Sequence, residues 1–285
     1  MAVVRKYLRR AHWSHLPADE TLMREWEAAM ATRPRASPEL VLKYQSLFGS
    51  LLHAGKFRPE ILAALGRLGS CLSFPTEGLY DCLMHVLVYL GRSRNLGTTF
   101  SGVEANAGKL RAFADSDWGV TRSTSGFVIM LAAASVVAVS RRQHCITMSS
   151  CEAELVALCD CAIELLHIIE IVQFLGHELS DAIEVFTDSK AAFDLCHRFT
   201  SAQNSRHVDR KLFKMRELRG SGRVTVKHIP GETNPADLFT KILTRQPFER
   251  HRKTVLNTAA NDGLESVRVQ CNATASSQRD GTGKP

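Results

Sequence analysis

The chain has 285 residues, and 45% of them are hydrophobic, which is enough to bury one large core or two ordinary ones. Its formal charge of +7 favours an anionic partner, most often nucleic acid, although many cytosolic enzymes are also mildly basic. No pair among the eight cysteines has the two-residue spacing of zinc sites, and no apolar run is long enough to span a membrane. These features point away from zinc-finger, disulfide-rich and membrane-spanning proteins, and we expect an intracellular protein, cytoplasmic or nuclear.

The first hundred residues have the pattern of helices joined by short turns. Residues 1–36 begin with a basic segment, and good helix formers predict a helix over Asp19–Thr32. In residues 37–100, a helix start is predicted at Ser37, and apolar residues at helical spacing follow it. We therefore expect an N-terminal extension followed by a small helical region.

The pattern changes to short apolar segments after a linker-like stretch at residues 101–109. Three closely connected segments predict an antiparallel meander. They are Leu110–Trp118, Ser125–Ala132 and Ser135–Ser140. A helix is predicted over about Ser150–Leu175, because a capping box stands at its start and Gly176 follows its end.

Helices and strands alternate from residue 183 onward. The predicted elements are a strand at Ile183–Thr187, helices at Ser189–His197 and Arg206–Arg219, a strand at Arg223–Ile229 and a helix at Pro235–Ile242. Three hairpin strands followed by alternating helices and strands predict an α/β fold, with a mixed sheet flanked by helices. One more helix, Pro247–Leu256, precedes a small, polar tail that we expect to be disordered.

Four carboxylates lie at the boundaries of these elements. Asp115 ends a strand, Glu154 lies in the first turns of the long helix, Asp188 ends another strand and Asp237 starts a helix. Four such groups at one edge of a sheet would repel one another unless a cation lay between them. Oxygen ligands of this kind suit Mg²⁺, so the sequence predicts a divalent-metal site.

Each acid also has a simpler explanation. Asp117 is on the same strand face as Asp115, so the period of two does not separate them. Glu152 belongs to the capping box, which explains it fully. Asp188 can cap the helix that follows it, and Asp237 can favour the positive end of its own helix. The pattern alone leaves these alternatives open.

Six short motifs stand out in the same region. They are Ala114–Trp118, Arg122–Phe127, Ser149–Leu158, Asp188–Ala192, Ser205–Asp209 and Pro235–Lys241. In this order, from about Leu110 to about Leu243, they resemble the ribonuclease H domain of copia-type retrotransposon Pol polyproteins. Any one of the motifs is weak evidence, but six in the family's order are highly specific.

The resemblance implies a ribonuclease H-like fold with five strands. It assigns the catalytic and metal-binding roles to Asp115, Glu154, Asp188 and Asp237. The implied cofactor is a pair of Mg²⁺ ions, with Mn²⁺ as a substitute, because two ions can activate water and stabilise the leaving oxygen. The implied reaction is hydrolysis of the RNA strand of RNA·DNA hybrids.

Segments before residue 100 extend the resemblance. Tyr44–Leu52, Arg58–Ile61 and Tyr89–Gly91 are similar to the thumb and connection region that follows the reverse transcriptase palm in these polyproteins. The polymerase needs adjacent aspartates, and the chain has no Asp-Asp pair, so reverse transcription is not encoded here. We therefore expect the reverse-transcriptase core and other Pol products as partners. We expect an extension (1–36), a thumb/connection-like remnant (37–100), a ribonuclease H-like domain (109–243) and a largely disordered tail (244–285).

Basic residues are predicted to contact the nucleic acid, since dense Lys and Arg neutralise phosphates without reading sequence. They are Arg206, Arg210, Lys211 and Lys214 on one helix, with Arg141 and Arg142 before the long helix. Two histidines are possible accessory residues. His207 matches a motif of the family, which leaves a structural or a substrate-side role open, whereas bonds to its neighbours are the simpler explanation of His228 on its strand.

Two other functions compete with the nuclease. A catalytically inactive, nucleic-acid-binding remnant of a decayed retroelement would use the same basic face. A strand transferase of the integrase type would place a glutamate last among its acids, whereas this chain has Glu154 second and Asp237 last. The sequence therefore favours a metal-dependent ribonuclease.

Overall fold

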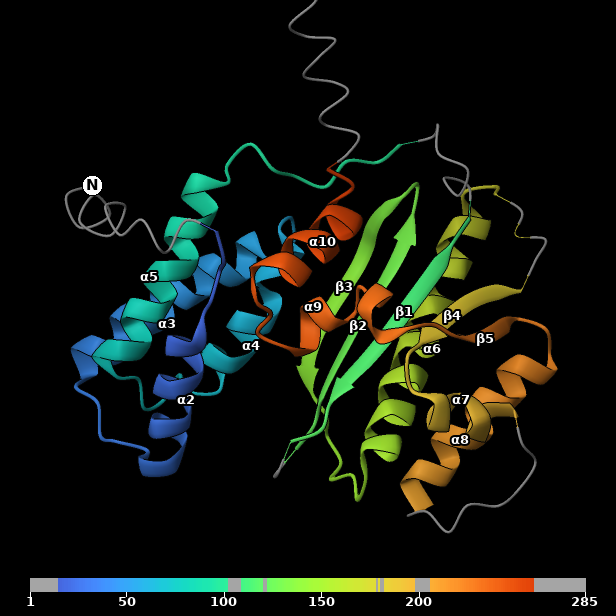
Figure 1. Ribbon diagram of the computed structural model, residues 1–285, viewed down its shortest axis with the longest axis horizontal. Coiled ribbons are helices and arrows are strands. Elements are labelled where there is room, and N and C mark those ends of the chain that lie inside the picture. Colours follow the sequence, from blue (N-terminus) through green and yellow to red (C-terminus); the bar gives the residue numbers. More distant parts are fainter. Residues whose placement is uncertain are drawn as a thin grey trace, which may run out of the picture.

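The computed structural model places helices on both faces of one β-sheet (Figure 1). It describes residues 15–101, 109–119, 122–177, 179, 182–197 and 206–258, without the side chains of residues 206–208. The basic N-terminal segment, most of the predicted linker and the polar tail beyond residue 258 lie outside the described residues.

The sheet has five strands in the order β3-β2-β1-β4-β5. They are β1 (Arg111–Asp117), β2 (Thr124–Leu131), β3 (Ala134–Arg142), β4 (Ile183–Thr187) and β5 (Val224–His228). The first three form the predicted antiparallel meander, while β4 pairs parallel to β1 and β5 pairs parallel to β4. This mixed five-stranded sheet flanked by helices confirms the predicted ribonuclease H-like fold.

Strand β1 is packed on both of its faces, because successive side chains of a strand point to opposite sides. Ala112 and Ala114 belong to one hydrophobic core, which they share with three helices on that side of the sheet. Phe113 joins the other core, on the opposite side. The helices of the first side are α6 (Ser150–Phe174), α7 (Lys190–His197) and α8 (Arg206–Gly220). A strand held on both faces presents its last residues rigidly.

On the side of the second face lie the helices of the first hundred residues and the C-terminal helices (Figure 1). They are α2 (Glu20–Thr32), α3 (Pro38–Ala54), the 3-10 turn η2 (Pro59–Ile61), α4 (Leu62–Gly69) and α5 (Glu77–Arg92), with α9 (Asp237–Thr240) and α10 (Arg245–Leu256). Leu65 and Leu83 share one hydrophobic core with Phe113, Val128 and Phe239. The predicted thumb/connection-like region and the sheet are thus joined by a common core.

The helix predicted at Pro235–Ile242 is much shorter than expected. Instead of Pro235–Ile242, the chain forms the 3-10 turn η3 (Gly231–Thr233) and then the four-residue α9. The Asn234 side chain accepts a hydrogen bond from the Ala236 backbone N–H at 3.2 Å, which replaces a helical bond at the start. Lys241 then takes an extended conformation and ends the helix. The prediction failed here because these local bonds compete with a regular helix.

No helix in the described part of the chain is long and apolar enough to cross a membrane. The seven cysteines of the described residues are free thiols, five of them buried: Cys71, Cys82, Cys159, Cys161 and Cys196. In these five, burial is the largest influence on the thiol and raises its pKa. These cysteines are therefore core residues with little thiolate character.

We expect Gly126→Ala to destabilise the protein by about 1–3 kcal/mol, the usual cost of overpacking. Gly126 lies on β2 opposite Asp115, and a Cβ there would approach Thr240 Cγ2 at 2.5 Å and Phe239 Cβ at 2.9 Å. Urea unfolding of the two proteins measures the difference. Gly49→Ala in α3 is the matched control, since nothing lies within 4 Å of its added Cβ, and it should raise stability by roughly 0.5–1 kcal/mol. Equal effects of the two substitutions would contradict the close packing of α9 on β2.

Candidate metal centre

Asp115 is the most deeply placed acid of the site, with 1% of its surface exposed near the end of β1. By strand alternation it faces the same side as Phe113, where α9 packs. One of its oxygens, Oδ2, accepts a hydrogen bond from the Thr240 hydroxyl and lies 3.4 Å from Lys241 Nζ. The close approach of α9, which Gly126 permits, therefore brings two donors to one carboxylate oxygen.

Glu154 approaches the end of β1 from α6, on the other side of the sheet. Ser149 caps this helix by accepting from the Glu152 N–H at 3.2 Å, and Glu152 Oε2 accepts from the Met148 N–H at 2.7 Å. Glu152 thus has the capping-box role that its position predicts. Glu154 Oε1 accepts from the Ser116 N–H at 3.3 Å, while its Oε2 is buried without a hydrogen-bond partner among the described residues.

Asp188 follows β4, which runs parallel to β1, so their carboxyl ends meet at the same edge of the sheet. The buried Asn234 side chain donates to Asp188 Oδ1 at 3.2 Å and to the Ala114 carbonyl at 3.0 Å. Helix α7 is capped by Ser189, whose hydroxyl accepts from the Ala192 N–H at 3.2 Å. Asp188 is therefore not needed as a cap, and its carboxylate is held toward β1.

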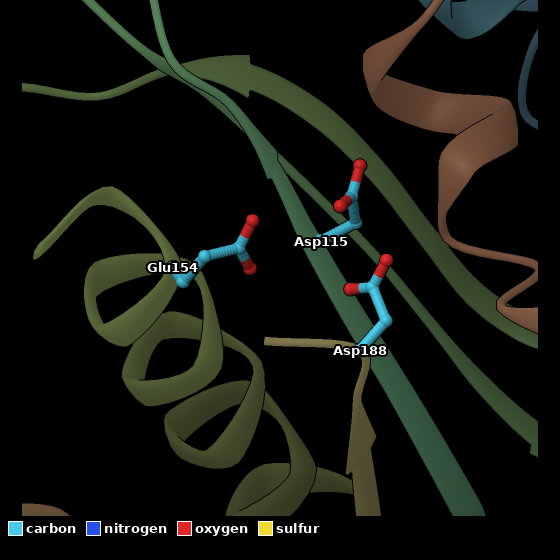
Figure 2. A group of neighbouring side chains, drawn as sticks. All are labelled: Asp115, Glu154 and Asp188. Atoms are coloured by element: carbon cyan, nitrogen blue, oxygen red, sulfur yellow. The ribbon is translucent and has the colours of Figure 1, made fainter. Parts of the chain in front are cut away.

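The three acids form one cluster. Asp115, Glu154 and Asp188 each offer an oxygen, and these oxygens lie within 4.8 Å of one another. Figure 2 shows the three side chains converging from β1, α6 and the end of β4. Burial raises the pKa of Asp115 and of Glu154, and the other carboxylates of the site raise both further. A divalent cation would relieve this repulsion and would give the unpaired Glu154 Oε2 a partner, so the donor set fits such an ion.

Asp237 does not belong to this three-acid cluster. Its Oδ1 lies 2.6 Å from Lys241 Nζ, and the same nitrogen contacts Asp115. Burial opposes the charged form of Lys241, but Asp115 and Asp237 outweigh it and raise the pKa of the ammonium group. Asp237 is thus linked to Asp115 through a lysine.

Asp117, the alternative to Asp115, forms an ion pair with Arg67 of α4. The Arg67 guanidinium also stacks over Trp26 at 5.0 Å, and the Trp26 indole N–H donates to Ser70 at 2.8 Å. Asp117 therefore connects the end of β1 to the N-terminal helices. Asp115 and Asp117 do share a strand face, as the period of two predicts, but they have different partners.

The predicted phosphate-binding residues have different surroundings. Arg141 and Lys211 both contact Asp160, at 3.1 Å for Arg141, and Lys214 Nζ lies 3.3 Å from Glu217. Arg210 and Arg142 are exposed. A cavity of about 250 Å³ between α4 and β3 is lined by Arg67, Arg141, Arg142 and Thr240, among others. The side chains of Arg206 and His207 lie outside the described residues.

His228 Nε2 lies 3.1 Å from the Asp188 carbonyl oxygen. It has a polar partner at the site, as the simpler interpretation of a strand histidine predicts, although its side chain is exposed.

Three residues that contact the acids were assigned no role from the sequence. Asn234 holds Asp188, Thr240 holds Asp115, and Lys241 bridges Asp115 and Asp237. All three belong to or adjoin the motif Pro235–Lys241, so the signal was their position in that motif. Their partners are up to 126 positions away in the chain, which spacing cannot reveal.

No protein-family model matches the chain. It is 28% identical over 240 residues to the retrovirus-related Pol polyprotein from transposon RE2 of Arabidopsis thaliana, a match over 79% of this chain and 16% of that protein. It is 26% identical over 217 residues to the Pol polyprotein from transposon TNT 1-94 of Nicotiana tabacum, a match over 74% of this chain and 16% of that protein. Over about three quarters of its length the chain is similar to the Pol polyproteins of copia-type retrotransposons.

The chain spans about a sixth of the length of those two relatives. A 120-residue match at 32% identity covers 40% of the chain and 83% of secreted RxLR effector protein 161 of Plasmopara viticola. Among solved structures, ribonuclease H1 of Halobacterium salinarum matches 46% of the chain, at 20% identity and a TM-score of 0.35. LC11-RNase H1 in complex with an RNA/DNA hybrid matches 53%, at 18% identity and a TM-score of 0.34. The strand order and directions described above remain the basis of the fold assignment.

We expect the metal-free chain to lose stability as the pH rises above about 4.5, the ordinary pKa of a glutamate. Glu154 has a raised pKa in the folded state, so folding favours its protonated form and the stabilisation present at low pH is lost on ionisation. The loss should be on the order of 1–3 kcal/mol, since one pKa unit corresponds to about 1.4 kcal/mol. Thermal unfolding across this pH range measures it.

Two variants and one addition complete this experiment. Glu154→Gln should flatten the pH dependence, whereas Glu170→Gln, an exposed position on the same helix, should leave it unchanged. Mn²⁺ at the high-pH end should restore stability to the unsubstituted protein, because an ion that binds only the folded state stabilises it. Asp115, whose pKa is also raised, should leave a smaller pH dependence of the same sign in Glu154→Gln, and an undiminished dependence would contradict the assignment to Glu154.

Proposed function

We propose that the chain is a metal-dependent endonuclease that hydrolyses the RNA strand of RNA·DNA hybrids as part of a retrotransposon Pol polyprotein. The observation that carries the proposal is the convergence of Asp115, Glu154 and Asp188 within 4.8 Å at the end of β1. Similarity to retrotransposon Pol polyproteins and the ribonuclease H-like fold support it. The proposed metal ligands are these three acids.

The fit of the site to a divalent cation rests on its unpaired oxygen. Glu154 Oε2 is buried and has no hydrogen-bond partner among the described residues, which is costly for a carboxylate unless an ion binds it. A bound divalent ion would supply a Lewis acid that polarises a phosphate oxygen and lowers the pKa of the attacking water. Mg²⁺ is the proposed ion, with Mn²⁺ as a substitute, because both accept carboxylate oxygens.

The residues of the chain orient the acids for this chemistry. The Ser116 N–H holds Glu154, the Asn234 amide holds Asp188, and the Thr240 hydroxyl holds Asp115. Each acid is therefore fixed by a separate donor, which keeps the ligand geometry ready before substrate arrives. Preorganisation of this kind removes reorganisation cost from the reaction step.

The nucleic acid would lie against exposed basic residues near this site. Arg142 is exposed and lines the cavity between α4 and β3, whose lining also includes Thr240, the partner of Asp115. Arg141 lines the same cavity with about half of its side chain exposed. Arg141 and Lys211 both contact Asp160, but the Lys211 side chain is only 26% exposed, against 47% for Arg141. We propose Arg141, Arg142 and Arg210 as phosphate contacts.

We expect the full chain to cut a labelled RNA·DNA hybrid only when Mg²⁺ or Mn²⁺ is present. Asp188→Asn and Glu154→Gln should each lower the rate on the order of a hundredfold or more, since losing a ligand charge costs several kcal/mol of transition-state stabilisation. Cleavage kinetics with the hybrid, and with RNA and DNA duplexes of the same sequence, measure both activity and substrate choice. Glu170→Gln on the exposed side of α6 is the matched control and should cut at the normal rate.

The same assay separates the nuclease from its rival. Tight hybrid binding by a folded sample, without cutting at any metal concentration, would identify a non-catalytic binding protein. Equal cutting by Asp188→Asn and the unsubstituted chain would show that the activity comes from elsewhere.

A further inference from the structure

The Lys241 ammonium group lies between two acids that were both predicted to bind metal. Its nitrogen is 2.6 Å from Asp237 Oδ1 and 3.4 Å from Asp115 Oδ2. About 41% of the Lys241 side chain is exposed, whereas 2% of Asp115 and 16% of Asp237 are. A fixed positive charge therefore occupies the space between these two carboxylates.

This charge is held in place by the local fold. Asp237 is the first residue of α9, and Lys241 is the residue after the helix ends. The two are therefore four positions apart, which is a spacing typical of ion pairs on helices. The Thr240 hydroxyl binds the same Asp115 oxygen as Lys241 does. Among the described residues, Thr240 and Lys241 both contact the Asp115 carboxylate at Oδ2, on the α9 side. Asp115 also belongs to the cluster with Glu154 and Asp188.

We propose that the Lys241 ammonium replaces the second of the two divalent ions predicted from the sequence. The site would then bind one ion, between Asp115, Glu154 and Asp188. Asp237 would be the counter-ion that positions Lys241, and not a metal ligand. The inference rests on the proposed function in one respect, because it requires that the three-acid cluster bind a divalent ion.

Counting bound Mn²⁺ on the full chain tests the proposal without any measurement of activity. Titration followed by electron paramagnetic resonance of free Mn²⁺ should give one tightly bound ion. Asp237→Asn should keep this count at one and should weaken binding, because Lys241 loses its counter-ion and repels the metal more strongly. Lys241→Met should tighten the first ion by about tenfold, the size expected for removing a nearby like charge in a partly solvated site.

Three controls keep the test specific. Lys241→Arg keeps the positive charge and should bind Mn²⁺ like the unsubstituted chain. Lys227→Met removes a lysine paired with Glu184 on β4 and should change nothing. Thermal unfolding of each variant verifies that it is folded, and Lys241→Gln repeats the measurement if Lys241→Met does not fold.

The outcomes separate the two proposals. Two ions of similar affinity in the unsubstituted chain, with one lost in Asp237→Asn, would overturn the role of Lys241 and keep the nuclease. Unchanged Mn²⁺ affinity in both Lys241→Met and Lys241→Gln would overturn it as well. No Mn²⁺ binding at all would remove the metal site itself, and both proposals would fail together.

Discussion

Electrostatic repulsion among buried carboxylates is the constraint on which the rest of the site depends. Asp115 is almost fully buried, and oxygens of Glu154 and Asp188 lie within 4.8 Å of one of its own. Such a group of like charges destabilises the fold unless protons, hydrogen-bond donors or cations compensate. The donors are present as Ser116 N–H, the Asn234 amide and the Thr240 hydroxyl, and Lys241 adds a positive charge on one side. What these groups leave uncompensated is Glu154 Oε2, which is why the cluster suits a bound cation.

Much of this arrangement could be predicted from the sequence because it depends on local rules. The capping box identifies Glu152 as a structural residue and leaves Glu154 for the site. Strand period places Asp115 on a known face, and parallel pairing of β1 with β4 brings Asp188 to the same edge. The antiparallel meander and the mixed sheet flanked by helices also follow from the succession of hairpin strands and alternating helices. These inferences need only the nearest neighbours in the chain.

The role of Asp237 could not be predicted in the same way. Its predicted role as a metal ligand came from a motif, yet its carboxylate contacts Lys241. Lys241 also contacts Asp115, which lies 126 positions before the lysine in the chain. The approach of α9 also depends on Gly126 in β2, where any side chain would collide with Thr240. Contacts of this kind join segments that no periodicity relates. The short length of α9 has the same origin, because the Asn234 side chain accepts a hydrogen bond from the Ala236 N–H and donates one to Asp188.

The N-terminal helices illustrate the limit most clearly, since the sequence alone leaves open whether residues 1–100 fold independently of the sheet. In the structure, Leu65 and Leu83 share a core with Phe113 and Val128 of the sheet, and Arg67 pairs with Asp117 two positions beyond Asp115. A segment starting near residue 109 would expose the part of that apolar face that α9 and α10 do not cover, and would leave Asp117 without Arg67. Burial of such a face contributes roughly 25 cal/mol for each Å² removed from water, so its exposure would be costly. The helices before residue 100 therefore support the same strand that carries the central acid of the site, and the full chain is the unit in which that acid is held.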